Sequence, residues 1–162
     1  MTLEQFAQLA EIIGTFVIVV TLIYMSIQAR QGTQMLRSEA RQAIAANDLD
    51  EIYKFVEYPE LGRLFSQVDK PEFEEKTRLL FWIIGSMRNR EHAWLQYKSG
   101  ASDEETWISY RGVIYFLLGT ERAMALWKLC SPYFNSEFVD MVGEMMAEAP
   151  PLDLWEKLEE VS

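Results

Sequence analysis

The residues from Ile12 to Ile27, with the sequence IIGTFVIVVTLIYMSI, form a run of sixteen without a charged side chain. As an α-helix this run is roughly 24 Å long at about 1.5 Å per residue, and with the three preceding residues it reaches about 28 Å. That length approaches the ~30 Å hydrocarbon core of a bilayer. Because the run is apolar on every side, it has no polar face to show to water. We therefore predict a membrane-spanning helix, with a buried or interfacial helix as the alternative.

The residues that flank the run predict its retention and its orientation. A signal peptide begins with basic residues and ends at a small-x-small cleavage site, whereas acidic residues precede this run and Gln-Ala-Arg-Gln follows it. Arg30, Arg37 and Arg41 follow the run, while no Lys or Arg precedes it. Flanks rich in Lys and Arg stay in the cytoplasm, so we expect the N-terminus outside and the rest of the chain inside. Membrane lipids are therefore predicted partners.

Small residues on the predicted span favour self-association. Ala10 and Gly14 form a small-xxx-small pair that lets two helix backbones approach closely, and Thr21 lies seven residues further along the same face. Copies tethered in one membrane also meet at a raised local concentration. We therefore predict a homo-oligomer that is held in part by the anchor helices.

A polar stripe runs along the outer half of the same helix. It consists of Glu4, Gln8, Glu11 and Thr15, which recur at helical spacing. One interpretation is an N-terminal turn at the membrane interface, where Glu11 reaches the headgroups. The alternative is a pore or channel-like assembly, in which the stripe lines a lumen and a ring of Glu11 carboxylates favours cations.

The composition of the remaining chain is typical of one folded domain. We assign residues 1–29 to the anchor and 30–162 to a cytosolic domain, and 49% hydrophobic residues suffice for a sizeable core. A net charge of −10 argues against a nucleic-acid binder, which needs a basic face to release counterions. Cys130 and His92 are each the single residue of their type, which excludes an intramolecular disulfide and a thiolate or two-histidine metal site. We expect no cofactor.

Every segment after the anchor predicts helix, and none alternates apolar and polar residues for long enough to form a strand. We predict an all-α fold, in which the anchor continues through Gly32 and stops before Pro59, followed by a bundle of about five further helices. Ser102 and Glu105 match a capping box at the start of one of them. Nine residues recur at helical spacing before Pro59 and are predicted to face the core: Met35, Leu36, Ala40, Ala43, Ile44, Leu49, Ile52, Tyr53 and Val56.

Arg88, Asn89 and His92 resemble the ribonuclease motif of HEPN domains, which are also all-helical. That motif places four to six residues between the Arg and the His, and only three separate them here. We therefore interpret His92 as a structural hydrogen-bonding residue. A catalytic role would require Arg88 and His92 to meet an acid in a cleft. Since the sequence offers no other convergent set of catalytic groups, we expect an interaction or scaffold module rather than an enzyme.

The run LIYMSIQARQGTQMLRS, from Leu22 to Ser38, resembles the junction of a large family of short, uncharacterised bacterial proteins. In that family an N-terminal membrane helix ends in Leu-Ile-Tyr, and Gln-x-Arg-Gln follows. The segments YPEL, WLQYKSGASDEETW and LGTERAMALWKLCSPYFNSEFVDMV are similar in order and spacing to its helical domain. The resemblance implies the inner membrane of a bacterium and carries no activity to transfer. We expect a membrane-anchored scaffold module that binds its own copies and an unidentified protein partner.

Overall fold

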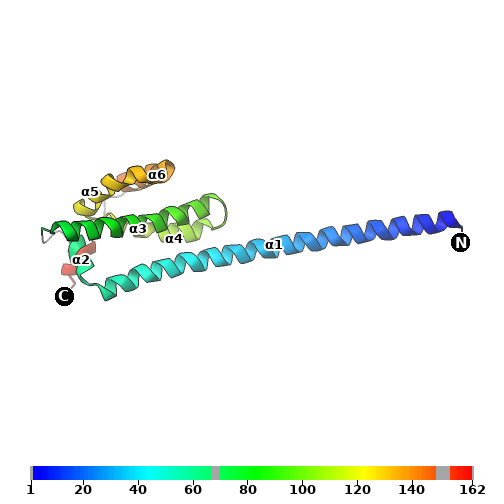
Figure 1. Ribbon diagram of the computed structural model, residues 1–162, viewed down its shortest axis with the longest axis horizontal. Coiled ribbons are helices and arrows are strands. Elements are labelled where there is room, and N and C mark those ends of the chain that lie inside the picture. The colour runs from blue at the N-terminus through cyan, green and yellow to red at the C-terminus, as the bar shows by residue number, and fades with distance from the viewer. Residues whose placement is uncertain (1, 67–69, 149–153, 162) are drawn as a thin grey trace. The chain divides into compact units, whose positions relative to one another are not determined.

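The computed structural model describes residues 2–66, 70–148 and 154–161 (Figure 1). All regular structure in these ranges is helical and none is strand, which confirms the predicted all-α fold. The chain divides into two units, residues 1–39 and residues 40–162. The helices are α1 (Leu3–Glu57), α2 (Glu60–Phe65), α3 (Phe73–Lys98), α4 (Glu104–Leu117), α5 (Glu121–Cys130), the short 3-10 helix η1 (Ser131–Tyr133), α6 (Ser136–Glu148) and α7 (Leu154–Glu159).

The first unit contains residues 3–39 of α1, and every side chain described in it is exposed. Among the described residues, α1 is the one helix long and apolar enough, by length and composition, to cross a membrane, and none of its most apolar window is buried. The hydroxyls of Thr15 and Thr21 donate to the carbonyls of Glu11 and Val17, at 2.9 and 2.8 Å. Both hydroxyls are therefore satisfied within the helix, as an apolar surrounding requires.

The ends of the helices follow local backbone chemistry. α1 continues through Gly32 and ends at Glu57 as predicted, because the ring of Pro59 disfavours the helical conformation of the residue before it. Thr120 caps α5 by accepting a hydrogen bond from the Ala123 N–H at 3.1 Å. Proline disfavours continuation of a helix, so Pro150 and Pro151 predict the end of α6 from the sequence, but both lie outside the described residues.

The predicted capping box at the start of α4 is wrong. Asp103, one residue after the predicted cap, accepts from the backbone N–H and from the hydroxyl of Thr106, at 2.9 and 2.6 Å. A carboxylate is the stronger acceptor at the positive end of a helix, so it takes the position. Ser102 is instead buried, and its hydroxyl has no hydrogen-bond partner among the described residues.

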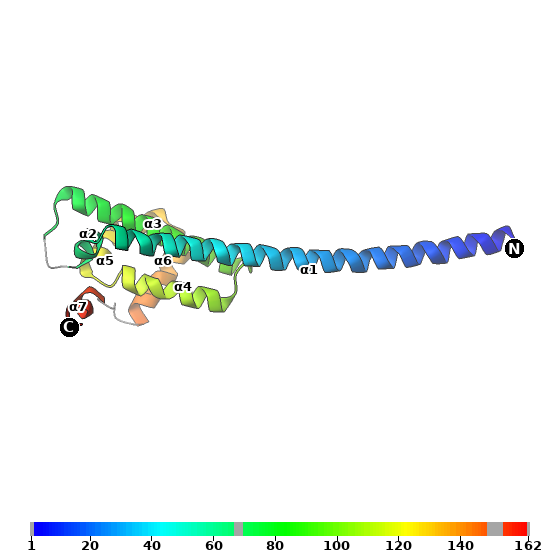
Figure 2. The ribbon, with the colours of Figure 1, turned by 90° about the horizontal axis from the view of Figure 1, so that it is seen from below.

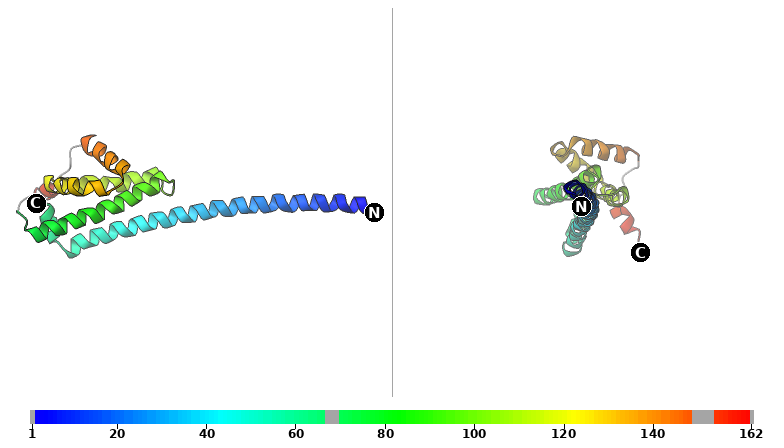
Figure 3. Two further views of the ribbon diagram at one scale, coloured as in Figure 1. Left: turned by 45° about the horizontal axis from the view of Figure 1, so that its top comes forward. Right: turned by 90° about the vertical axis from the view of Figure 1, so that its right-hand side faces the viewer.

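The core of the second unit lies between its helices. α3 and α4 run side by side, with α5 and α6 on one side of the pair and residues 40–57 of α1 on the other (Figures 1 and 2). Figure 3 gives the same arrangement from two further directions. Leu79, Ile83 and Met87 of α3 are fully buried and form a core-facing row, while Phe81 on another side of the same helix is exposed. Each such burial stabilises the fold by about 1.5–3 kcal/mol.

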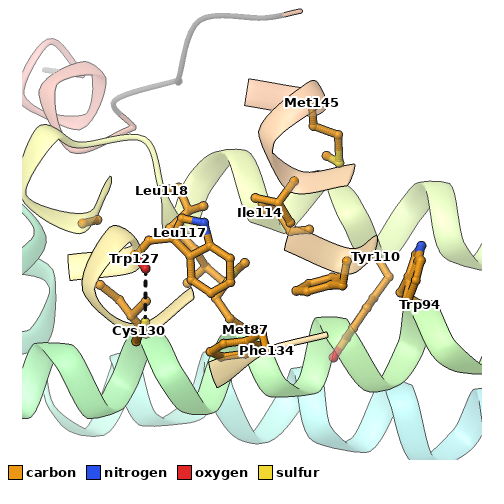
Figure 4. Packing of buried hydrophobic residues seen from close by; sticks show 14 of the residues in the cluster. Met87, Trp94, Tyr110, Ile114, Leu117, Leu118, Trp127, Cys130, Phe134 and Met145 are labelled. Carbon is orange, nitrogen blue, oxygen red and sulfur yellow. Dashed lines mark hydrogen bonds between the residues drawn. The ribbon is translucent and has the colours of Figure 1, made fainter. Parts of the chain in front are cut away.

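Aromatic side chains from α5, from Phe134 directly after η1, and from α6 complete this core (Figure 4). The rings of Trp127 and Phe134 meet edge to face with centroids 4.8 Å apart. Cys130 is buried in the same core, and its thiol lies 3.5 Å from the Trp127 carbonyl oxygen. Burial raises the pKa of that thiol above its ordinary value. The thiolate is therefore scarce at neutral pH, and Cys130 is a poor nucleophile.

The predicted core-facing stripe of α1 is also wrong. Of its nine residues, only Ile44 is buried. Leu49, Ile52, Tyr53 and Val56 are exposed by 51%, 51%, 66% and 74%, respectively. The reason is that a different row of the helix, which contains two acidic residues, is turned toward the core.

Candidate functional site

The core-facing row of α1 in the second unit consists of Ile44, Asp48, Glu51 and Phe55. Their spacing of four, three and four residues places them on one side of an α-helix. The two ends of the row are apolar. Ile44 is buried in the core, and the ring of Phe55 packs against aromatic rings from four other positions: Phe65, Trp82, Phe116 and Trp155. Asp48 and Glu51 lie between these ends, and their carboxylates need a cation to offset the cost of their burial.

Arg90 of α3 supplies that cation and is only 1% exposed. Its Nη1 donates to Glu51 at 2.6 Å, and its Nη2 donates to Asp48 at 2.8 Å. Asn89 donates a further hydrogen bond to Glu51. The guanidinium carbon also lies 4.5 Å from the centre of the Tyr110 ring of α4. One buried positive charge is thus held by two carboxylates and an aromatic face, which offsets the cost of removing these charges from water.

A cavity of about 480 Å³ lies beside this network. It is open to solvent and is bounded by residues 41–48 of α1 on one side and residues 103–110 on the other. At its rim the guanidinium of Arg41 forms an ion pair with Asp103. The lining residues are Arg41, Ile44, Ala45, Asp48, Asp103, Glu105, Thr106, Ser109 and Tyr110.

Tyr110 connects the cavity to the buried network. The residue is only 7% exposed, yet it lines the cavity. The hydroxyl points away from the apolar side chains of Ile114 and Met145 (Figure 4). It forms no hydrogen bond with any described residue. Burial raises the pKa of Tyr110 to about 12, with a smaller opposing effect from Arg90, so the hydroxyl stays protonated and neutral at pH 7.

The two polar residues singled out on α3, Arg88 and His92, have different partners. Arg88 donates to Glu91 and to the Tyr133 carbonyl oxygen, both at 2.6 Å, and its guanidinium lies over the Phe134 ring. His92 is exposed, and its Nε2 lies 2.9 Å from the Gln96 side-chain nitrogen. Neither residue lines the cavity described above. Arg88 therefore links α3 to the segment before α6.

The residues singled out on the anchor are all exposed in the first unit. This holds for the packing set of Ala10, Gly14 and Thr21, and a Cβ at Gly14 would meet no atom within 4 Å. It also holds for the polar stripe of Glu4, Gln8, Glu11 and Thr15. Self-association through the packing set stays a prediction, and so does a pore lined by the stripe. The structure of a single chain tests neither of them.

Comparison with known proteins adds no assignment. No protein-family model matches the chain, and neither the curated proteins nor the solved structures contain a match. Within the described residues, no three His, Cys, Asp or Glu side chains are grouped so that they could hold a metal ion. A functional proposal therefore rests on the exposed apolar surface of α1 and on the cavity.

Proposed function

We propose that this chain is a membrane-anchored helical interaction module, with the Ile12–Ile27 run as the anchor and the second unit as the interacting part. The observation that carries the proposal is this uncharged run itself, which is long and apolar enough to cross a membrane and of whose most apolar window none is buried. Ten Ile, Val, Leu and Phe residues in the run each favour insertion by about 0.3–0.6 kcal/mol at the centre of a spanning helix. Together they favour the membrane by roughly 3–6 kcal/mol.

Charge supports an orientation with the second unit in the cytoplasm. Arg30 and Arg37 follow the run and are exposed, while Glu4 and Glu11 are the charged residues before it. Basic residues stay on the cytoplasmic side, where each contributes about 1 kcal/mol of attraction to anionic headgroups. The family resemblance of the Leu22–Ser38 junction supports the same proposal and suggests the inner membrane of a bacterium.

The partner that we propose is a second copy of the same chain. Leu49, Ile52, Tyr53 and Val56 form an exposed apolar stripe on the second unit, with the spacing of one helix face. The core does not use this stripe, because the row of Asp48 and Glu51 faces Arg90 instead. Anchoring would present the stripes of neighbouring copies in the same orientation and at a raised local concentration. Such copies can pair along the stripe.

Val56→Glu should weaken self-association about tenfold or more, because it places a carboxylate in the proposed apolar contact. Asn47→Glu is the matched control, since Asn47 is exposed on the same helix outside the stripe. We expect this control to associate like the wild-type protein. The measurement is sedimentation equilibrium of the full chain in a non-ionic detergent over a range of concentrations, with near-UV circular dichroism to check the fold.

Gly14→Leu in the same assay separates the two proposed contacts. A loss of association would place part of the contact in the anchor, and unchanged association would place it in the second unit. A wild-type protein that stays monomeric at every concentration would end the proposal of self-association.

A further inference from the structure

The cavity beside Arg90 has an excess of negative charge. Its lining contains the carboxylates of Asp48, Asp103 and Glu105 and one guanidinium, that of Arg41, which gives a net charge of −2. Arg90 and Glu51 behind the cavity add one charge of each sign and leave the net charge unchanged. The low-dielectric walls of a cleft focus the field that an excess of one sign of charge produces inside it. The cavity therefore selects a cation.

Polar groups in the lining are available to such a ligand. The carboxylate of Glu105 has no hydrogen bond or ion pair with any described residue, and the same is true of the Ser109 hydroxyl. The Tyr110 side chain is largely buried, and its hydroxyl has no hydrogen-bond partner among the described residues, although the residue lines the cavity. The hydroxyl oxygen can accept a hydrogen bond from a ligand N–H.

The spacing of these groups favours an organic cation over a metal ion. The carboxylates of the described residues are not grouped closely enough to hold a metal. The cavity of about 480 Å³ has the size of a small-molecule site. Its wall also contains the apolar side chains of Ile44 and Ala45, which can contact a chain of methylene groups.

We propose that this cavity binds a small aliphatic diamine or polyamine. One ammonium group contacts Asp48 and the hydroxyl of Tyr110, a second contacts Glu105, and the methylene groups between them lie along Ile44 and Ala45. The site lies wholly in the second unit and uses none of the residues of the apolar stripe. Its occupation is therefore independent of self-association.

The test is isothermal titration calorimetry of spermidine into the full chain in a non-ionic detergent, at fixed ionic strength. We expect saturable binding of one spermidine per chain. Glu105→Gln should weaken the affinity about tenfold or more, because it removes a charge-assisted hydrogen bond. Glu104→Gln is the matched control, since Glu104 is the neighbouring exposed acid and does not line the cavity. This control should stay within about twofold of the wild-type affinity, as expected for an exposed charge outside the site.

Tyr110→Phe is the second variant, and it should also weaken binding about tenfold. It keeps the ring that lies against Arg90 and removes only the hydroxyl. If this variant unfolds, the Glu105 and Glu104 pair decides the question. An absence of saturable binding by the wild-type protein would overturn the proposal. Equal losses in Glu105→Gln and Glu104→Gln would overturn it as well, because they would indicate a diffuse attraction to an acidic surface.

Discussion

Arg90→Met lowers the free energy of unfolding by about 3–5 kcal/mol, which is the usual cost of removing one partner of a buried ion pair. Glu51 is 9% exposed and would keep only the hydrogen bond from Asn89, while Asp48 would lose its cation. Because folded domains are stable by only about 5–15 kcal/mol, this loss is a large part of the total. The measurement is denaturant unfolding of the full chain in a non-ionic detergent, followed by near-UV circular dichroism.

Arg111→Met is the matched control, because Arg111 is a partly exposed arginine of α4 without a hydrogen bond or ion pair to any described residue. We expect it to change the free energy of unfolding by less than about 0.5 kcal/mol. The double variant Arg90→Met with Glu51→Met should recover part of the loss, since it replaces the buried charges by apolar groups. Equal stability of Arg90→Met and Arg111→Met would contradict the structural role assigned to Arg90.

The second large effect that we expect is on the free energy of membrane insertion of the anchor. Replacing both Val19 and Val20 by Asp places two carboxylates at the centre of the uncharged run, at a cost of roughly 5–7 kcal/mol for insertion. This cost cancels most or all of the roughly 3–6 kcal/mol that we assign to the apolar side chains of the run. We expect the variant to leave the membrane pellet after an alkaline carbonate wash, whereas the wild-type protein stays in it.

The control for this experiment adds the same charge outside the run. Gln31 and Gln34 are exposed residues of α1 that follow it. The variant with Asp at both positions should remain in the membrane pellet like the wild-type protein. Extraction of this control together with the Val19 and Val20 variant would show that net charge, rather than the position of the charge, governs attachment.

The ends of the helices could be predicted from the sequence because they depend on neighbouring residues. Pro59 limits α1 and Thr120 caps α5 through contacts that span four residues or fewer. At the start of α4 the same reasoning chose Ser102 over Asp103. Both residue types cap helices, and the capping-box spacing from Ser102 to Glu105 was given more weight than the stronger acceptor, the Asp103 carboxylate.

The inward face of α1 could not be predicted from hydrophobicity. The pattern of apolar residues favours Leu49 and Val56 as core residues, yet the structure buries Glu51 and leaves both of them exposed. The cause is Arg90, which lies 39 residues beyond Glu51 and 42 beyond Asp48. The cavity was missed for a similar reason, since its two sides are separated by about sixty residues in the sequence. One sequence signal could have indicated the inward face of α1, namely the helical spacing of Ile44, Asp48, Glu51 and Phe55.

We propose that one helix crosses the membrane, with the second unit in the cytoplasm. Labelling of one introduced cysteine at a time with a membrane-impermeant maleimide tests it in spheroplasts that contain the full chain. Thr2→Cys and Val161→Cys place thiols at exposed positions near the two ends, and Cys130 can stay because it is buried and its thiol pKa is raised. We predict that Thr2→Cys reacts in intact spheroplasts and that Val161→Cys reacts only after lysis. Reaction of both sites before lysis, or of Val161→Cys alone, would contradict the account.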